Sequence, residues 1–139
     1  MTIAQTETTT ELDAYYSTIE AMGSLRTTEL AQRWSMATLQ MLGHNLGRGS
    51  KKKLANALPD ELTADLKRVF WLVHFRDKQK PAVEFQKEVA RRAGVTDAQF
   101  AKIPVTAVFH ALKQLVDNDV SDAVADDLSP EISDLWKNA

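Results

Sequence analysis

The sequence contains no cysteine, and its apolar residues form no run that would cross a membrane. The absence of cysteine excludes disulfides, thiolate metal ligands and cysteine nucleophiles, and it fits a reducing compartment. A membrane-spanning helix needs about 20 mostly apolar residues. The first ten residues show neither the cationic start nor the apolar stretch of a secretory signal. We therefore expect a cytoplasmic protein with no membrane partner.

Glycine and proline are also scarce, with five and four residues in a chain of 139. No segment alternates apolar and polar residues as a half-buried strand does. Apolar residues instead recur every three or four positions, which indicates helices. We predict an all-α fold, a helical bundle forming a single domain over residues 11–139. Residues 1–10 are predicted to be a disordered tail, because they offer few apolar groups to offset the entropy of ordering them.

Helix signals mark four segments in the first half of the chain. The predicted helices run from Glu11 to Met22, from a cap at Thr27 or Thr28 to Leu46, from a cap at Ser50 to Ala57, and from Pro59 to Phe75. The second helix is apolar on almost every side, which is typical of a buried central helix. The last two turns of the fourth are apolar all round, so the second half of the chain is expected to cover them.

The two halves of the sequence match each other when one is shifted by 70 residues. Repeat one would span about 11–76 and repeat two about 81–139, with three to four helices each around one shared core. The pairing rests on coinciding apolar positions: Tyr15 with Phe85, Ile19 with Val89, Leu39 with Phe109, Leu54 with Val124, and Leu62 with Ile132. Trp34 is matched by Pro104, so the second long helix is expected to kink or restart there.

These residues carry a family resemblance. The run at 84–95, the apolar helix at 107–112 and the Leu-Ser-Pro-Glu step at 128–131 resemble bacterial proteins of the domain of unknown function 2267 family, here as a tandem duplication. The 47–53 loop departs from the family pattern, and Ser129 stands where proline is usual. The resemblance implies a helical fold, offers no established activity and supplies no catalytic residues to carry over.

Charge is distributed unevenly along the chain. Residues 48–92 hold twelve Lys or Arg against six Asp or Glu, whereas both flanks are acidic. The basic middle could bind an anion or a partner through Arg48, Lys51, Lys52, Lys53, Arg76, Lys78, Lys80, Arg91 and Arg92. The loop at the position equivalent to 47–53 is acidic, with Asp117, Asp119 and Asp122. This inversion leads to the hypothesis that the first half of one molecule pairs with the second half of another.

Three segments allow both a specific functional interpretation and a simpler structural one. The glycines and lysines at 47–53 could cradle a phosphate, but they lack the spacing and preceding strand of a Walker loop and are explained by a solvated connector. Asp117, Asp119 and Ser121 imitate the start of a calcium loop, yet the required glycine and glutamate are missing, and a helix cap explains them. Residues 89–96 read like part of a helix-turn-helix, but the next helix is too apolar to contact bases.

Nothing in the chain forms a recognisable catalytic group. His44, His74 and His110 are isolated from other ligands, so we expect no enzyme activity, no cofactor and no metal. The leading hypothesis is a non-enzymatic protein-interaction or regulatory module that associates with a protein partner or with itself as a homo-oligomer. The alternative is nucleic-acid or anion binding through segment 48–92. A third possibility is a small-molecule pocket between the repeats, near Trp34, Trp71, His74 and His110.

Overall fold

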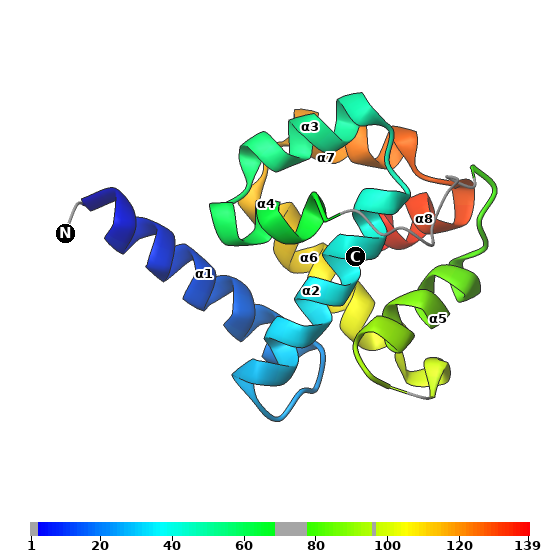
Figure 1. Cartoon of the computed structure of the whole chain (residues 1–139), viewed down its shortest axis with the longest axis horizontal. Helices are drawn as coiled ribbons and strands as arrows, with labels where there is room; N and C mark the ends of the chain where they lie inside the picture. The colour runs from blue at the N-terminus through cyan, green and yellow to red at the C-terminus, as the bar shows by residue number, and fades with distance from the viewer. Residues whose placement is uncertain (1–2, 69–77, 96) are drawn as a thin grey trace.

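The computed structural model describes residues 3–68, 78–95 and 97–139, and within them it contains α-helices, one short 3-10 helix and no strand (Figure 1). The helices are α1 Ile3–Met22, α2 Thr28–His44, α3 Arg48–Ala57, α4 Asp60–Leu66, α5 Ala82–Arg92, α6 Lys102–Leu115, α7 Asn118–Asp127 and α8 Pro130–Asn138; the 3-10 helix η1 is Ala98–Phe100. The predicted all-α class is confirmed.

The start of α2 follows the predicted cap. The Thr27 side chain accepts a hydrogen bond from the backbone amide of Leu30 at 3.1 Å. Helix α1 differs from expectation, because it begins at Ile3 and makes most of the expected tail helical. Extending a helix that already exists costs far less than nucleating one, so weak helix formers such as threonine can continue it.

A close contact between α2 and α4 depends on Gly43. A Cβ atom at this position would lie only 2.2 Å from the backbone oxygen of Leu66, the last residue of α4. The missing side chain therefore allows the two helices to approach each other. The fourth helix, predicted to run to Phe75, ends at Leu66 with Lys67 as its C-cap. The apolar last turns predicted for it, together with Trp71 and His74, fall within residues 69–77, outside the described part of the chain.

The second long helix restarts where the sequence predicted it would. Helix α6 begins at Lys102, so Pro104 lies in its first turn, where a missing amide costs no intrahelical hydrogen bond. Gly94 follows α5 with a positive φ of 81°, a conformation that glycine adopts without strain. The short helix η1 then connects this turn to α6.

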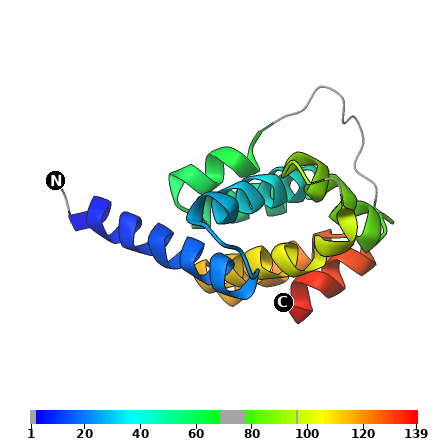
Figure 2. The ribbon, with the colours of Figure 1, turned by 90° about the horizontal axis from the view of Figure 1, so that it is seen from below.

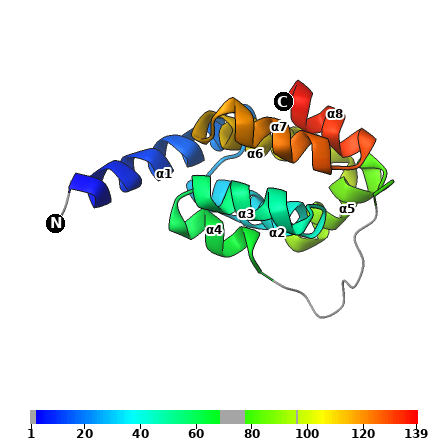
Figure 3. The ribbon, with the colours of Figure 1, turned by 90° about the horizontal axis from the view of Figure 1, so that it is seen from above.

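The first helix of each half packs on the long helix of the other half. Helix α1 contacts α6, and α5 contacts α2. The long helices α2 and α6 also contact each other, and α3 lies beside α7 (Figures 2 and 3). Each half thus covers the apolar surface of the other, and the helices share one core.

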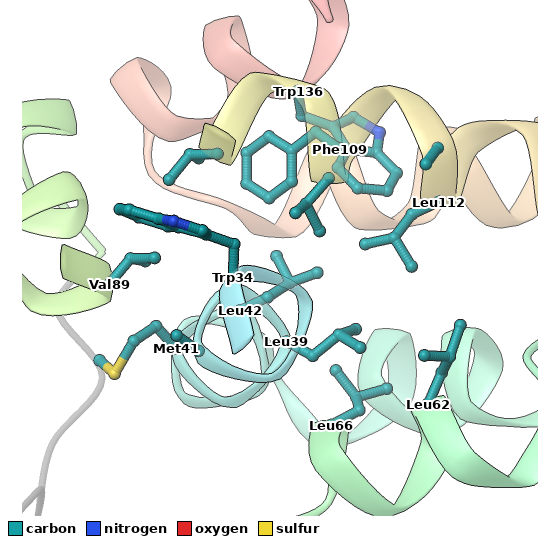
Figure 4. Packing of buried hydrophobic residues seen from close by; sticks show 14 of the residues in the cluster. Trp34, Leu39, Met41, Leu42, Leu62, Leu66, Val89, Phe109, Leu112 and Trp136 are labelled. Atoms are coloured by element: carbon teal, nitrogen blue, oxygen red, sulfur yellow. The ribbon is translucent and has the colours of Figure 1, made fainter. Parts of the chain in front are cut away.

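Aromatic side chains from both halves meet in this core. Figure 4 shows Trp34 reaching from α2 into the space between Val89 on α5 and Phe109 on α6. The ring centroids of Phe109 and Trp136 lie 5.2 Å apart, and the two rings meet edge-on. The hydroxyl groups of Tyr15 on α1 and Ser35 on α2 share a buried hydrogen bond of 2.7 Å. Trp34, which the third possibility placed near a small-molecule pocket, is 5% exposed and packed among apolar groups.

Candidate functional site

Two oppositely charged helices lie side by side on one part of the surface (Figure 3). Helix α3 carries four basic residues and no acidic one, whereas α7 carries four acidic residues and no basic one. Most of these side chains are exposed: Arg48, Lys52 and Lys53 on α3, and Asp119, Asp122 and Asp126 on α7. We call these six residues the α3–α7 face. The opposite charges that the sequence analysis assigned to different molecules are thus neighbours within one chain.

Asp127 fixes the direction of the two helices relative to each other. Its carboxylate, at the end of α7, accepts hydrogen bonds from the Gly47 amide and the Ser50 hydroxyl at the start of α3. The end of α7 therefore lies against the beginning of α3, and the helices run antiparallel. A carboxylate at a helix N-terminus also interacts favourably with the free amides and the helix dipole. Ser50, the predicted cap, lies inside α3, whose N-cap residue is Gly47.

A second group of charged side chains surrounds His44, the last residue of α2. Burial lowers the pKa of His44, and the positive charges of Lys51 and Arg92 lower it further, followed by Lys80, whereas Glu88 opposes them. These residues come from α3, α5 and the segment before α5. The structure thus brings together basic residues of the predicted set that are as many as 41 positions apart.

The group borders a cleft of about 350 Å³, lined among the described residues by Met41, Glu88, Arg91 and Arg92. We call it the α2–α5 cleft. At its edge, Lys80 and Glu88 form an ion pair, with side chains that are 15% and 26% exposed. Arg92 is affected by both burial and charge: burial lowers its pKa, and the like charges of Arg68 and Arg91 lower it further, against the opposing effect of Glu88.

Lys51 differs from its neighbours on α3. Its pKa is lowered by partial burial and by the charge of Lys67, and its side chain lies close to Gly43. Lys51 therefore belongs with the His44 group, whereas Arg48, Lys52 and Lys53 are exposed. Of the other predicted basic residues, Lys78 is exposed before α5, and Arg76 lies outside the described residues.

The acidic residues proposed as a loop belong to α7. The Asp117 side chain caps this helix by accepting a hydrogen bond from the Val120 amide at 3.0 Å, while Asp119 and Asp122 are exposed on the helix. Among the described residues, no three His, Asp or Glu side chains are grouped as metal ligands. Helix α6, which would have been the recognition helix, buries Val105, Phe109 and Leu112.

Sequence reasoning missed Met41, Glu88 and Asp127 as parts of these surfaces, and it treated His44 as isolated. The spacing of Glu88, Arg91 and Arg92 on one helix face was visible. Only the packing of α5 on α2 brings them beside Met41 and His44, and that contact has no local signal in the sequence.

The described residues define a class of protein: an all-helical protein with a shared core and charged surfaces. Within that part of the chain, no helix is long and apolar enough to cross a membrane. The chain belongs to the family of uncharacterized conserved proteins called DUF2267, whose family model matches residues 13–136. The family resemblance is thereby confirmed. No curated protein sequence matches the chain.

Proposed function

We propose that this chain is a non-enzymatic interaction module that associates with a second copy of itself through the α3–α7 face. The observation that carries the proposal is the exposed basic strip on α3 directly beside the exposed acidic strip on α7. We place this function in the cytoplasm.

The arrangement suits a symmetric dimer. If a second copy is turned over about a twofold axis parallel to the two helices, its α3 lies against the first copy's α7, and the converse contact forms at the same time. Both contacts then join opposite charges. Exposed ion pairs contribute only about 0.2–1 kcal/mol each and are screened by salt, so the dimer should be weak and salt-sensitive.

Charge exchange tests the proposal. Lys52→Glu and Asp122→Lys change equivalent positions of α3 and α7, since the two residues are related by the 70-residue shift. By light scattering at low salt, the unchanged protein should be dimeric, each variant monomeric, and an equimolar mixture of the two variants dimeric. The mixture regains association because the acidic side chain introduced at position 52 of one variant then faces the basic side chain introduced at position 122 of the other, and the unchanged Asp122 and Lys52 face each other at the second contact. A protein that is monomeric at low salt, or variants that dimerise unchanged, would refute the proposal.

A second candidate function, binding of an anionic ligand or nucleic acid, is favoured by the cluster of Lys51, Lys80, Arg91 and Arg92 around His44. Binding of nucleic acid can be tested during purification. If the protein carries nucleic acid, its ratio of absorbance at 260 nm to that at 280 nm is raised at low salt and falls at high salt.

We also infer that the two halves arose by duplication. Four described boundaries repeat at the 70-residue shift: α3 and α7 match at both ends, α4 and α8 begin together, and α1 and α5 end together. Coinciding boundaries and reciprocal packing support descent from a dimer of single repeats.

A further inference from the structure

The α2–α5 cleft lies apart from the proposed self-association surface and has its own chemistry. We propose that this cleft binds a small organic anion, whose phosphate or carboxylate group is held by Arg91 in the positive field of Lys51 and Arg92, and whose hydroxyl or amine group donates to Glu88. The proposal deepens the second candidate function and does not depend on dimerisation.

Charge at the cleft favours an anion. Glu88 is paired with Lys80 through Oε1, so that pair is close to neutral. Lys51 and Arg92 both act as positive charges on His44, and Arg91 adds a further positive charge in the lining of the cleft. Arg91 is exposed, and its planar guanidinium can form two parallel hydrogen bonds to a phosphate or carboxylate. Burial is the main cause of the lowered pKa of His44, and the positive charges of Lys51 and Arg92 lower it further. A bound anion would reverse the part that is due to these charges.

Glu88 provides the second point of recognition. Its carboxylate lines the cleft, and its Oε2 atom is buried with no hydrogen bond from any described group. A buried acceptor without a donor costs about 1–3 kcal/mol. A small turn about the last side-chain torsion, which is soft for glutamate, would present Oε2 to a donor in the cleft. A hydroxyl or amine beside the anionic group would therefore satisfy it.

The dimensions indicate a small molecule. A volume of about 350 Å³ lies at the lower end of the range for small-molecule sites, about 300–1,000 Å³. The flexible, polarizable side chain of Met41 offers an apolar wall for the carbon skeleton of the ligand. Phosphorylated sugars combine all three features: an anion, hydroxyl donors and a short carbon chain.

Ribose 5-phosphate is a suitable probe, with ribose and inorganic phosphate as its two parts. Binding can be followed through the imidazole signals of His44 in NMR spectra of the full chain, assigned by comparison with His44→Gln. Ribose 5-phosphate should bind saturably with one site per chain and raise the pKa of His44, since the anion stabilises the imidazolium. Signals of His110, which contacts Gln114, serve as an internal control.

Variants separate the cleft from general surface charge. Arg91→Ala should weaken binding about tenfold or more, as expected for loss of a charge-assisted contact. Glu88→Gln should reduce the preference for ribose 5-phosphate over inorganic phosphate. Arg33→Ala is the matched control, because Arg33 is an exposed arginine two turns before Met41 on α2 and should leave binding unchanged.

Several outcomes would overturn the proposal. The first is that the NMR signals of His44 show no saturable change up to about 10 mM ribose 5-phosphate. The second is that Arg33→Ala and Arg91→Ala lose the same affinity for this probe. The third is that an oligonucleotide binds far more tightly than the probe and binds both variants equally well. Repeating the titration with monomeric Lys52→Glu distinguishes the two proposals: binding retained in that variant would support the cleft whether or not the chain dimerises.

Discussion

Asp127 and Ser50 are 77 residues apart in the sequence, yet a hydrogen bond joins the end of α7 to the first turn of α3. The same carboxylate accepts from the Gly47 amide. One side chain of the second half therefore completes a helix of the first half, and it holds two oppositely charged helices in a fixed antiparallel arrangement.

Removing this carboxylate should destabilise the protein. Asp127→Ala leaves the Gly47 amide without its acceptor and is expected to lower the free energy of unfolding by about 1–2 kcal/mol, the usual cost of losing a helix cap. Urea denaturation followed by circular dichroism measures the change. Asp126→Ala is the control, because Asp126 is exposed and should cost little. Equal effects of the two variants would argue against a capping role.

Two glycines should respond to alanine in opposite directions. Gly43→Ala places a Cβ 2.2 Å from the Leu66 oxygen, so α2 and α4 must separate, at a cost of about 1–3 kcal/mol. Gly49→Ala lies in α3 with no heavy atom within 4 Å of the added Cβ and should stabilise by about 0.5–1 kcal/mol. Thermal denaturation distinguishes the two. A neutral Gly43→Ala would show that α2 and α4 are less closely apposed.

Stability should fall in alkali because of the two tyrosines. Burial raises the pKa of Tyr15 and of Tyr16, and hydrogen bonding to Glu61 adds to the effect at Tyr16. A phenol whose pKa is raised by folding contributes its full stability below its unfolded pKa of about 10 and loses it as the pH rises beyond that value.

Ultraviolet absorbance of tyrosinate against pH tests this expectation. Both tyrosines should ionise together with unfolding, above pH 10. Tyr15→Phe should reduce the alkaline loss of stability. It should also lower stability at neutral pH by about 1–2 kcal/mol, because the Ser35 hydroxyl loses its partner. Ionisation of both groups near pH 10 in the folded state would contradict the prediction.

Neither half should fold alone. Since α1 packs on α6 and α5 packs on α2, a fragment of residues 1–77 or 78–139 exposes the apolar side of its own long helix. Each fragment should show a weak helical signal in circular dichroism and little chemical-shift dispersion in its NMR spectra. Mixing the two fragments should restore a folded complex. A fragment that folds cooperatively on its own would contradict the shared core.

The class of the fold and several helix boundaries could be predicted because their causes are local. Thr27 caps α2 by accepting a hydrogen bond from the nearby Leu30 amide. Pro104, which has no amide hydrogen, fits the first turn of α6. The charged surfaces could be predicted only as residue sets. The grouping of Lys51 with His44 and Arg92, and the cap supplied by Asp127, depend on how distant helices pack, for which a single sequence carries no direct signal.

The reciprocal packing of α1 on α6 and α5 on α2 has a consequence for synthesis. Translation at roughly 5–20 residues per second leaves α2 waiting roughly 4–14 s for α6 to emerge. During that time Trp34, Leu39 and Leu42, all buried in the finished protein, have no cover from the second half. The nascent chain therefore exposes an apolar, aggregation-prone helix that chaperones on the ribosome would recognise. Its folding also starts late for a small helical protein, because the core needs contacts between distant parts of the chain.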